Sequence, residues 1–494
     1  MNDEIIYDDD GKISDILRFN DVYTIYNISR YTLTILIRPC EISEAIIESD
    51  VRYDISTVAK LYPGRHLTIE SIRVDKAQID LHYANGAITV SDRYSSAVLD
   101  NHYKYTSTGS HLRGVYWQKQ KLVINDGAIG VTPLKFGTSV TMTNDGNTLL
   151  VGAPGRSFNS GAVFLYSFDG ETYNQSQIIQ GLNTRVGYNF GQTVSISGDG
   201  GFFIASGPHT DGSAGCLYVF FKSGSNYNQL QQIFEPNFVL PSRYGHFILI
   251  SEDNGTVIVS APDKVVDSKS VGVVYVYRYS FGTYYLYQTI TGIDAFGDAG
   301  DGSAFGDGVD YASGFDIIAV GMPGYGNGKV VIFKNNGTSY VRVNDISCDT
   351  DQVNDTGFGT NLAFGINELI ICAPDYGNNQ GLVEYYDIDS NGAVNLKQYF
   401  TGGVNDRLGN FALHTPTRDE LFISGIDDGG VVYAYAEPSH ELDYELTQVI
   451  SPYVSKSTDQ FGYSTATTIN GDYVVIGDPG YDSETGTAYI FKKS

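Results

Sequence analysis

Short runs of apolar residues, many of them β-branched or aromatic, alternate with turn residues along the chain, and the 3.6-residue period of an amphipathic helix is absent. One segment shows the pattern clearly, with β runs at 139–143, 148–154, 161–166 and 174–179. The intervening Asn144-Asp145-Gly146 is typical of a hairpin turn, because glycine accepts the positive φ that tight turns need. The segment therefore predicts a unit of four short antiparallel strands.

The same unit recurs about every fifty residues, and each copy opens with a large apolar residue followed by glycine. The openings are Phe136-Gly137, Phe190-Gly191, Tyr244-Gly245, Phe305-Gly306, Phe358-Gly359, Leu408-Gly409 and Phe461-Gly462. Seven units of four strands predict an all-β fold, a seven-bladed β-propeller whose blades pack around a channel.

Two further positions recur: a proline after the second run, and a glycine before the third. The prolines are Pro154, Pro208, Pro262, Pro323, Pro374 and Pro479, and the sixth unit lacks one. The glycines are Gly161, Gly215, Gly272, Gly328, Gly381, Gly430 and Gly486. We expect structural roles for the opening pair and the proline. We expect the aromatic residue to pack between neighbouring blades and its glycine to leave room for another backbone to approach. The proline lacks an N–H group, which costs no ladder hydrogen bond at the last residue of the second strand.

This combination resembles the FG-GAP repeat, the blade unit of integrin α-subunit propellers and of many microbial and viral surface proteins. The resemblance covers residues 136–494 and implies an adhesion-type propeller. The family often carries an Asp-x-Asp-x-Asp-Gly calcium loop between its first two strands. The matching turns here, such as Asn144-Asp145-Gly146 and Gly198-Asp199-Gly200, lack three spaced carboxylates. We therefore do not expect calcium at these turns.

The last unit ends near Phe491 and has no residues left for a fourth strand, which would leave an open sheet edge. Residues 116–124, just before the first unit, carry the tyrosine, glutamine and terminal isoleucine of the fourth runs at 227–233 and 444–450. We therefore predict that strand 116–124 completes the seventh blade and closes the ring.

Residues 1–95 lack the repeat signature but contain β runs at 31–37, 66–72, 78–82 and 87–90. They predict a small N-terminal β-sandwich-like domain that anchors the protein in a larger assembly. Residues 96–114, rich in serine, threonine and glycine, predict a linker, and the propeller is expected to span 115–494.

The chain has 57 acidic and 31 basic residues and a net charge of −26, which disfavours nucleic acid and anionic membranes as partners. Four cysteines without Cys-x-x-Cys spacing predict neither a zinc site nor a disulfide framework. The N-terminal residues lack the pattern of a secretory signal, and no apolar run is long enough to insert into a membrane.

The third unit is the longest, and its extra residues predict two loops, 263–270 and 292–302, on one face of the propeller. For binding we single out Asp263, Asp267, Phe296 and Asp298. For a metal ion, Asp294, Asp298 and Asp301 lie in a glycine-rich loop of the kind that suits calcium, and Asp307 and Asp310, which follow it, could gather around the same cation. A solvated acidic loop is the alternative, and no other cofactor is expected.

The spacing of histidine, serine and glycine shows no catalytic elbow and no phosphate-binding loop, so we expect a non-enzymatic structural and binding protein. An adhesion-type propeller without a secretory signal fits a virion, as a capsid or tail component. The N-terminal domain would then bind other proteins of the particle, and the propeller loops a host surface protein or glycan. A cellular adhesion or scaffold propeller, at the cell surface or in the cytoplasm, is the alternative. A hydrolase that uses the channel is a third.

Overall fold

The computed structural model describes residues 116–124, 133–208, 215–237, 242–296, 301–348, 357–403, 405–415, 420–426, 429–437, 443–452 and 456–493, with eight strands in the first 115 residues. The chain separates into two compact units, residues 120–444 with 455–490 and residues 1–119 with 445–454 and 491–494.

The first 115 residues contain strands in three small antiparallel sheets. Their order is β1-β7, β6-β2-β8 and β3-β5-β4. The strands are β1 (Ile16–Arg18), β2 (Val22–Asn27), β3 (Leu33–Leu36), β4 (Val51–Asp54), β5 (Val58–Leu61), β6 (His66–Glu70), β7 (Arg73–Asp75) and β8 (Ile88–Asp92). The β run expected at 78–82 and the linker at 96–114 lie outside the described residues. The anchoring role and the domain boundaries stay predictions.

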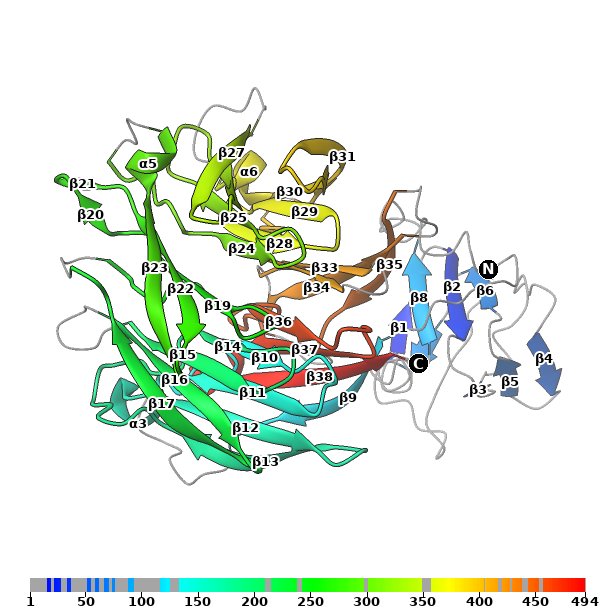
Figure 1. Ribbon diagram of the computed structural model, residues 1–494. Coiled ribbons are helices and arrows are strands. Elements are labelled where there is room, and N and C mark those ends of the chain that lie inside the picture. The colour runs from blue at the N-terminus through cyan, green and yellow to red at the C-terminus, as the bar shows by residue number, and fades with distance from the viewer. Residues whose placement is uncertain are drawn as a thin grey trace. The chain divides into compact units, whose positions relative to one another are not determined.

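Seven four-stranded sheets form the blades of a propeller (Figure 1). Blades 1 to 3 contain β10 (Val140–Met142), β11 (Thr148–Ala153), β12 (Ala162–Phe168) and β13 (Tyr173–Ile179), then β14 (Val194–Ile196), β15 (Phe202–Gly207), β16 (Cys216–Ser223) and β17 (Asn226–Phe234), then β18 (Ile248–Ile250), β19 (Thr256–Ala261), β22 (Val273–Ser280) and β23 (Thr283–Thr291).

Blades 4 to 6 repeat this order. They contain β24 (Val309–Ala312), β25 (Ile317–Met322), β26 (Lys329–Asn335) and β27 (Tyr340–Ser347), then β28 (Asn361–Phe364), β29 (Glu368–Ala373), β30 (Leu382–Ile388) and β31 (Val394–Thr401), then β32 (Phe411–Thr415), β33 (Glu420–Gly425), β34 (Val431–Ala436) and β35 (Glu445–Ile450). The all-β fold and the seven blades predicted from the repeats are confirmed.

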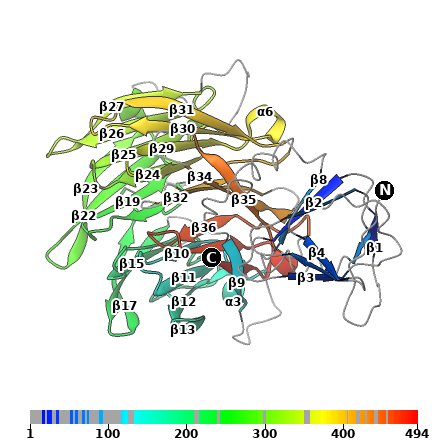
Figure 2. The ribbon, with the colours of Figure 1, turned by 90° about the vertical axis from the view of Figure 1, so that its right-hand side faces the viewer.

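Blade 7 combines the two ends of the repeat region. Its strands are β36 (Ser464–Thr467), β37 (Tyr473–Asp478), β38 (Thr487–Lys493) and β9 (Tyr116–Leu122), in this order across the sheet. Figures 1 and 2 show the cyan strand β9 beside the red C-terminal strands. The hydroxyl of Thr487 donates a hydrogen bond to the carbonyl oxygen of Leu122 at 2.6 Å. The sheet therefore has the fourth strand that its own repeat lacks.

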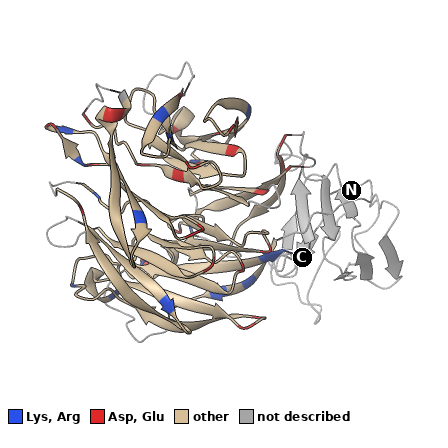
Figure 3. Ribbon diagram, viewed as in Figure 1, with Lys and Arg blue, Asp and Glu red and all other residues tan. Residues whose placement is uncertain are grey.

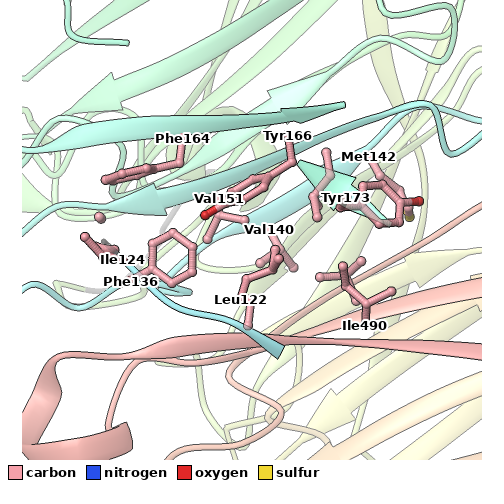
Figure 4. Packing of buried hydrophobic residues seen from close by; sticks show 14 of the residues in the cluster. Leu122, Ile124, Phe136, Val140, Met142, Val151, Phe164, Tyr166, Tyr173 and Ile490 are labelled. Carbon is pink, nitrogen blue, oxygen red and sulfur yellow. The ribbon is translucent and has the colours of Figure 1, made fainter. Parts of the chain in front are cut away.

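The hydrophobic core lies between blades, and each opening aromatic residue is part of it. Phe136 is fully buried among side chains of blade 7, such as Leu122 and Ile490, and of blade 1, such as Val151 and Phe164 (Figure 4). Its ring meets that of Phe164 edge to face, with the centroids 5.4 Å apart, which is a favoured aromatic geometry. Phe190, Phe305, Phe358 and Phe461 are likewise fully buried.

Each repeat proline follows the last residue of a second strand directly. Pro154, Pro208, Pro262, Pro323, Pro374 and Pro479 come after β11, β15, β19, β25, β29 and β37. In blade 6, Ile426 takes this position after β33.

A backbone latch recurs at five described seams between blades, where Phe136, Phe190, Phe305, Leu408 and Phe461 donate, and it explains the recurring glycines. At the seam of blades 7 and 1, the N–H group of Phe136 donates to the carbonyl of Thr485 at 3.2 Å. Gly486 has a φ of +81°, and a Cβ atom there would lie 2.2 Å from the carbonyl oxygen of Phe136. The latch therefore requires glycine. Within blade 1, the N–H group of Gly137 donates to the carbonyl of Gly152 at 3.0 Å.

A second inter-blade contact explains the tyrosine and glutamine of the fourth strands. The side chain of Gln231 in β17 bonds both backbone groups of Tyr284 in β23, each at 2.9 Å. We call this contact the glutamine clamp. It recurs between Gln120 and Tyr173, Gln177 and Tyr227, Gln288 and Tyr340, Gln398 and Tyr444, and Gln448 and Tyr116. Between blades 4 and 5, Asn344 instead makes one bond to the carbonyl of Gly392 at 3.0 Å.

Candidate functional site

The two insertions of blade 3 lie side by side. The first contains a small hairpin of β20 (Val265–Val266) and β21 (Lys269–Ser270), and the second contains α5 (Gly292–Phe296) (Figure 1). The carboxylate of Asp301 accepts a bond from the backbone N–H of Ser270 at 2.6 Å, and the N–H of Gly302 donates to the carbonyl of Ser270 at 2.8 Å. We call residues 263–270 and 292–302 the blade 3 loops.

An ionic network fixes the base of these loops to the next blade. Two nitrogens of Arg243, just before the third opening, bond the carboxylate of Asp263 at 2.5 and 2.9 Å. The guanidinium of Arg243 also lies 3.3 Å from the carboxylate of Asp307, in the opening loop of blade 4, and His246 contacts the same carboxylate at 3.3 Å. Burial disfavours the charged form of Asp307, but His246 and Arg243 outweigh it and hold the pKa of this carboxyl below its ordinary value.

A buried ion pair lies below the first loop and connects it to blade 2. The ammonium of Lys264 is 3.0 Å from a carboxylate oxygen of Glu235, and their side chains are 6% and 0% exposed. Lys264 also donates to the carbonyl of Asn237 at 2.7 Å, and the hydroxyl of Tyr275 donates to Glu235 at 3.1 Å. Burial raises the pKa of Glu235 although these donors oppose the shift. The pairing therefore offsets only part of the cost of burying the Glu235 carboxylate. Together with Arg243, the ion pair ties the first loop to blade 2.

The structure divides the predicted binding residues. Asp263 is part of the ionic network, whereas Asp267 lies exposed at the tip of the β20–β21 hairpin with a φ of +49°. Phe296 is the last residue of α5, and its side chain lies outside the described residues, as does all of Asp298. Figure 3 shows charges of both signs along the hairpin and acidic residues at α5.

The two described aspartates of the predicted metal site accept hydrogen bonds from different residues. Asp294 accepts bonds from the backbone N–H and the hydroxyl of Thr291 at 2.9 and 2.7 Å. Asp301 bonds Ser270 of the other loop. In the part of the chain that the structure describes, no group of three or more histidine, cysteine, aspartate or glutamate side chains could hold a metal ion. Because Asp298 is not described, the calcium site stays a hypothesis.

Sequence reasoning missed Arg243, His246, Lys264 and Glu235, and it considered Asp307 only as a ligand for a cation. A signal was present for Arg243, because it directly precedes the third opening, Asp307 directly follows the fourth, and consecutive openings meet at one seam. The described charges at the base are paired with each other. The network therefore fixes the base of the first loop at Asp263 and Lys264, while Asp267 at the hairpin tip is exposed.

These features define a seven-bladed β-propeller with two neighbouring loops on one blade, a fold that favours a protein-binding or structural role. None of the described helices has the length and apolar character needed to cross a membrane.

Comparisons with known proteins agree with this fold. No model of a known protein family matches the chain. Integrin alpha-PS5 of Drosophila melanogaster is 27% identical over 217 residues, which is 40% of this chain and 21% of that protein. The crystal structure of the β-propeller domain of Cps50 (Swd1) from Myceliophteria thermophila superposes with a TM-score of 0.51 at 13% identity, and the match covers 76% of this chain and 100% of that one. This second similarity shows the fold alone.

Proposed function

We propose that this chain is a non-enzymatic recognition protein built from FG-GAP-type blades, and that its blade 3 loops bind a surface protein or glycan. The observation that carries the proposal is the way the loops are held. Bonds from Arg243 and Lys264 fix their base, while the tip at Asp267 is exposed. A preorganised loop loses little conformational freedom on binding, which favours affinity. The similarity to an integrin α-subunit supports an adhesion-type propeller.

The test compares the unaltered full-length chain with a variant on a glycan array and on intact cells. Asp267→Gly removes an exposed side chain at a position whose positive φ glycine accepts, so the hairpin should keep its shape. Asp482→Gly is the matched control, because Asp482 is also exposed, has a φ of +49° and follows the second strand of blade 7. We expect Asp267→Gly to weaken binding by about tenfold, the effect of losing one good contact, and the control to leave it unchanged. Equal binding by all three proteins would contradict the proposal.

We further propose that the protein is carried on a virion, where residues 1–95 bind another particle protein and the propeller faces outward. The support is contextual: the repeats resemble FG-GAP blades, which also build viral surface proteins. Quantitative mass spectrometry of particles purified from cells that make this chain should find it in a fixed ratio to the main particle protein. Its absence from the particles would favour the alternative, a cellular adhesion or scaffold propeller, which the integrin similarity also supports.

A further inference from the structure

We propose that three exposed apolar side chains on blades 1 and 2, Phe158, Leu182 and Val186, form a docking surface for an acidic peptide segment of a protein partner that carries a large apolar side chain. We call these residues the Phe158 surface. It is separate from the blade 3 loops, so the inference goes beyond the proposed function and does not depend on it.

The first observation is a turn that three blades share. α3 (Arg156–Asn159), α6 (Tyr376–Asn379) and α7 (Tyr481–Glu484) connect second and third strands, and each ends with three residues of positive φ. The same backbone bond holds each turn. The carbonyl oxygen of its last residue accepts an N–H from the loop that enters the next blade, at 2.7, 2.8 and 2.9 Å for Asn159, Asn379 and Glu484. The shape of the turn therefore follows from its backbone.

The residue in the middle of the turn differs between the blades. Asn378 in blade 5 and Ser483 in blade 7 are small and polar, whereas blade 1 has Phe158, with a φ of 58° and a ψ of 46°. This left-handed conformation is unfavourable for a bulky side chain. The ring is also 54% exposed, so it adds little to the core. Strained residues of this kind cluster at binding sites, but the strain alone does not identify one, because Phe281 shares it.

The second observation is apolar exposure on the adjoining loop. Leu182 and Val186 are 64% and 70% exposed. Their loop is docked on α3, because the N–H of Gly187 donates to the carbonyl of Phe158 at 3.2 Å. At the other end of the loop, the N–H of Leu182 donates to the side chain of Gln229 at 2.6 Å. The three apolar side chains thus project from two segments whose backbones are fixed together. Exposed apolar residues on adjoining segments favour an interaction site.

The third observation is charge, and it selects the partner. Segments 155–161 and 181–190 contain Arg156 and Arg185 and no acidic residue, although the chain as a whole has a net charge of −26. Two arginines beside an apolar surface attract carboxylates, and a negatively charged protein repels acidic segments elsewhere on its surface. An acidic segment with one large apolar side chain complements both features.

The test is a selection of random peptides displayed on phage against the full-length chain, followed by affinity measurements with the synthetic peptides that are enriched. Phe158→Asn places the blade 5 residue in blade 1, where asparagine accepts a positive φ more readily than phenylalanine, so the variant should fold. The matched control is Phe281→Asn. Phe281 is also an exposed phenylalanine of positive φ, 51°, but it lies in the β22–β23 turn of blade 3.

We expect the enriched peptides to combine Asp or Glu with a large apolar residue. Phe158→Asn should weaken their binding by about tenfold or more, as for a buried aromatic anchor, while Phe281→Asn and Asp267→Gly leave it unchanged. Arg185→Glu should weaken it too, and added salt should reduce the binding of the unaltered chain. Enrichment of peptides without acidic residues, or equal binding by Phe158→Asn, would overturn the proposal. So would Phe158-dependent dimers in analytical ultracentrifugation, because a second copy would then occupy the surface.

Discussion

At the scale of single residues, close backbone approach decides which substitutions the fold tolerates. Repeat glycines such as Gly486 and Gly161 meet the carbonyl of the next opening residue, so a side chain has no space. Buried carboxylates are a second sensitive class. Asp478, for example, is fully buried at the end of β37, where blade 1 has Ala153.

We expect Gly486→Ala to destabilise the protein by about 3 kcal/mol or more, because the substitution combines a positive φ with a backbone clash. Gly170→Ala is the control: Gly170 has a φ of +99°, but nothing lies within 4 Å of the position that a Cβ atom would take there. The control should cost only the conformational part, about 1–2 kcal/mol. Urea denaturation measures both, and equal losses would show that the latch does not confine Gly486.

Asp478→Asn should reveal a pH-dependent cost of the buried carboxyl. Burial raises the pKa of Asp478 to about 6, although the backbone N–H of Gln460 bonds the carboxylate at 2.8 Å. The folded protein therefore holds this proton more tightly than the unfolded chain. The contribution of Asp478 to the free energy of unfolding falls as pH rises from about 4 to about 6.

The asparagine variant lacks this titration. The free energy of unfolding of the variant, minus that of the unaltered protein, should be about 1–3 kcal/mol larger at pH 7.5 than at pH 4, which means that the variant is relatively more stable at the higher pH. Urea denaturation at the two pH values gives this difference, and any constant effect of the substitution cancels from it. A difference of zero, or of opposite sign, would mean that Asp478 is ionised in the folded protein at no cost.

At the scale of elements, the fourth strands join neighbouring blades by side chain to backbone bonds, and the glutamine clamp is the repeated contact. The tyrosine and glutamine could be recognised in the sequence as a pattern, and this pattern led to residues 116–124 as a fourth strand. The sequence did not show why these two residues recur, because the glutamine and the tyrosine that it bonds, such as Gln231 and Tyr284, belong to different repeats. Packing of the opening aromatic could be predicted because every repeat carries a large apolar residue at that position.

The candidate site was harder to predict than the fold. Loop length located the blade 3 loops, but Arg243, which bonds both Asp263 and Asp307, lies 20 and 64 residues away from them in the sequence. The spacing of Asp294 and Asp301 suggested a shared cation, whereas each bonds a nearby hydroxyl or N–H group of its own. Short-range spacing cannot distinguish carboxylates that converge from those that cap turns.

Gln231→Ala should destabilise the protein by about 1–3 kcal/mol, because it leaves the N–H and carbonyl groups of Tyr284 without their partner at a partly buried seam. Asn228→Ala lies in the same strand at an exposed position and should change stability by less than about 0.5 kcal/mol. Thermal unfolding of both variants tests this expectation. Similar melting temperatures would show that the clamp adds nothing to the seam.

At the scale of the whole molecule, the account depends on a closed ring. Blade 7 takes β36, β37 and β38 from the end of the chain and β9 from before the first repeat. The side chain of Gln448 in blade 6 bonds both backbone groups of Tyr116 in β9, each at 2.7 Å. Closure protects the last sheet edge and keeps each blade between two neighbours, so the blade 3 loops and the Phe158 surface stand on a rigid support.

Hydrogen–deuterium exchange of the full-length chain, followed peptide by peptide, tests this closure most directly. If β9 is the fourth strand of blade 7, the amides of Tyr116–Leu122 should exchange as slowly as those of Asn226–Phe234, the fourth strand of blade 2. Exchange of Tyr116–Leu122 at the rate of an unpaired segment, while Asn226–Phe234 stays protected, would contradict the closed seven-bladed ring.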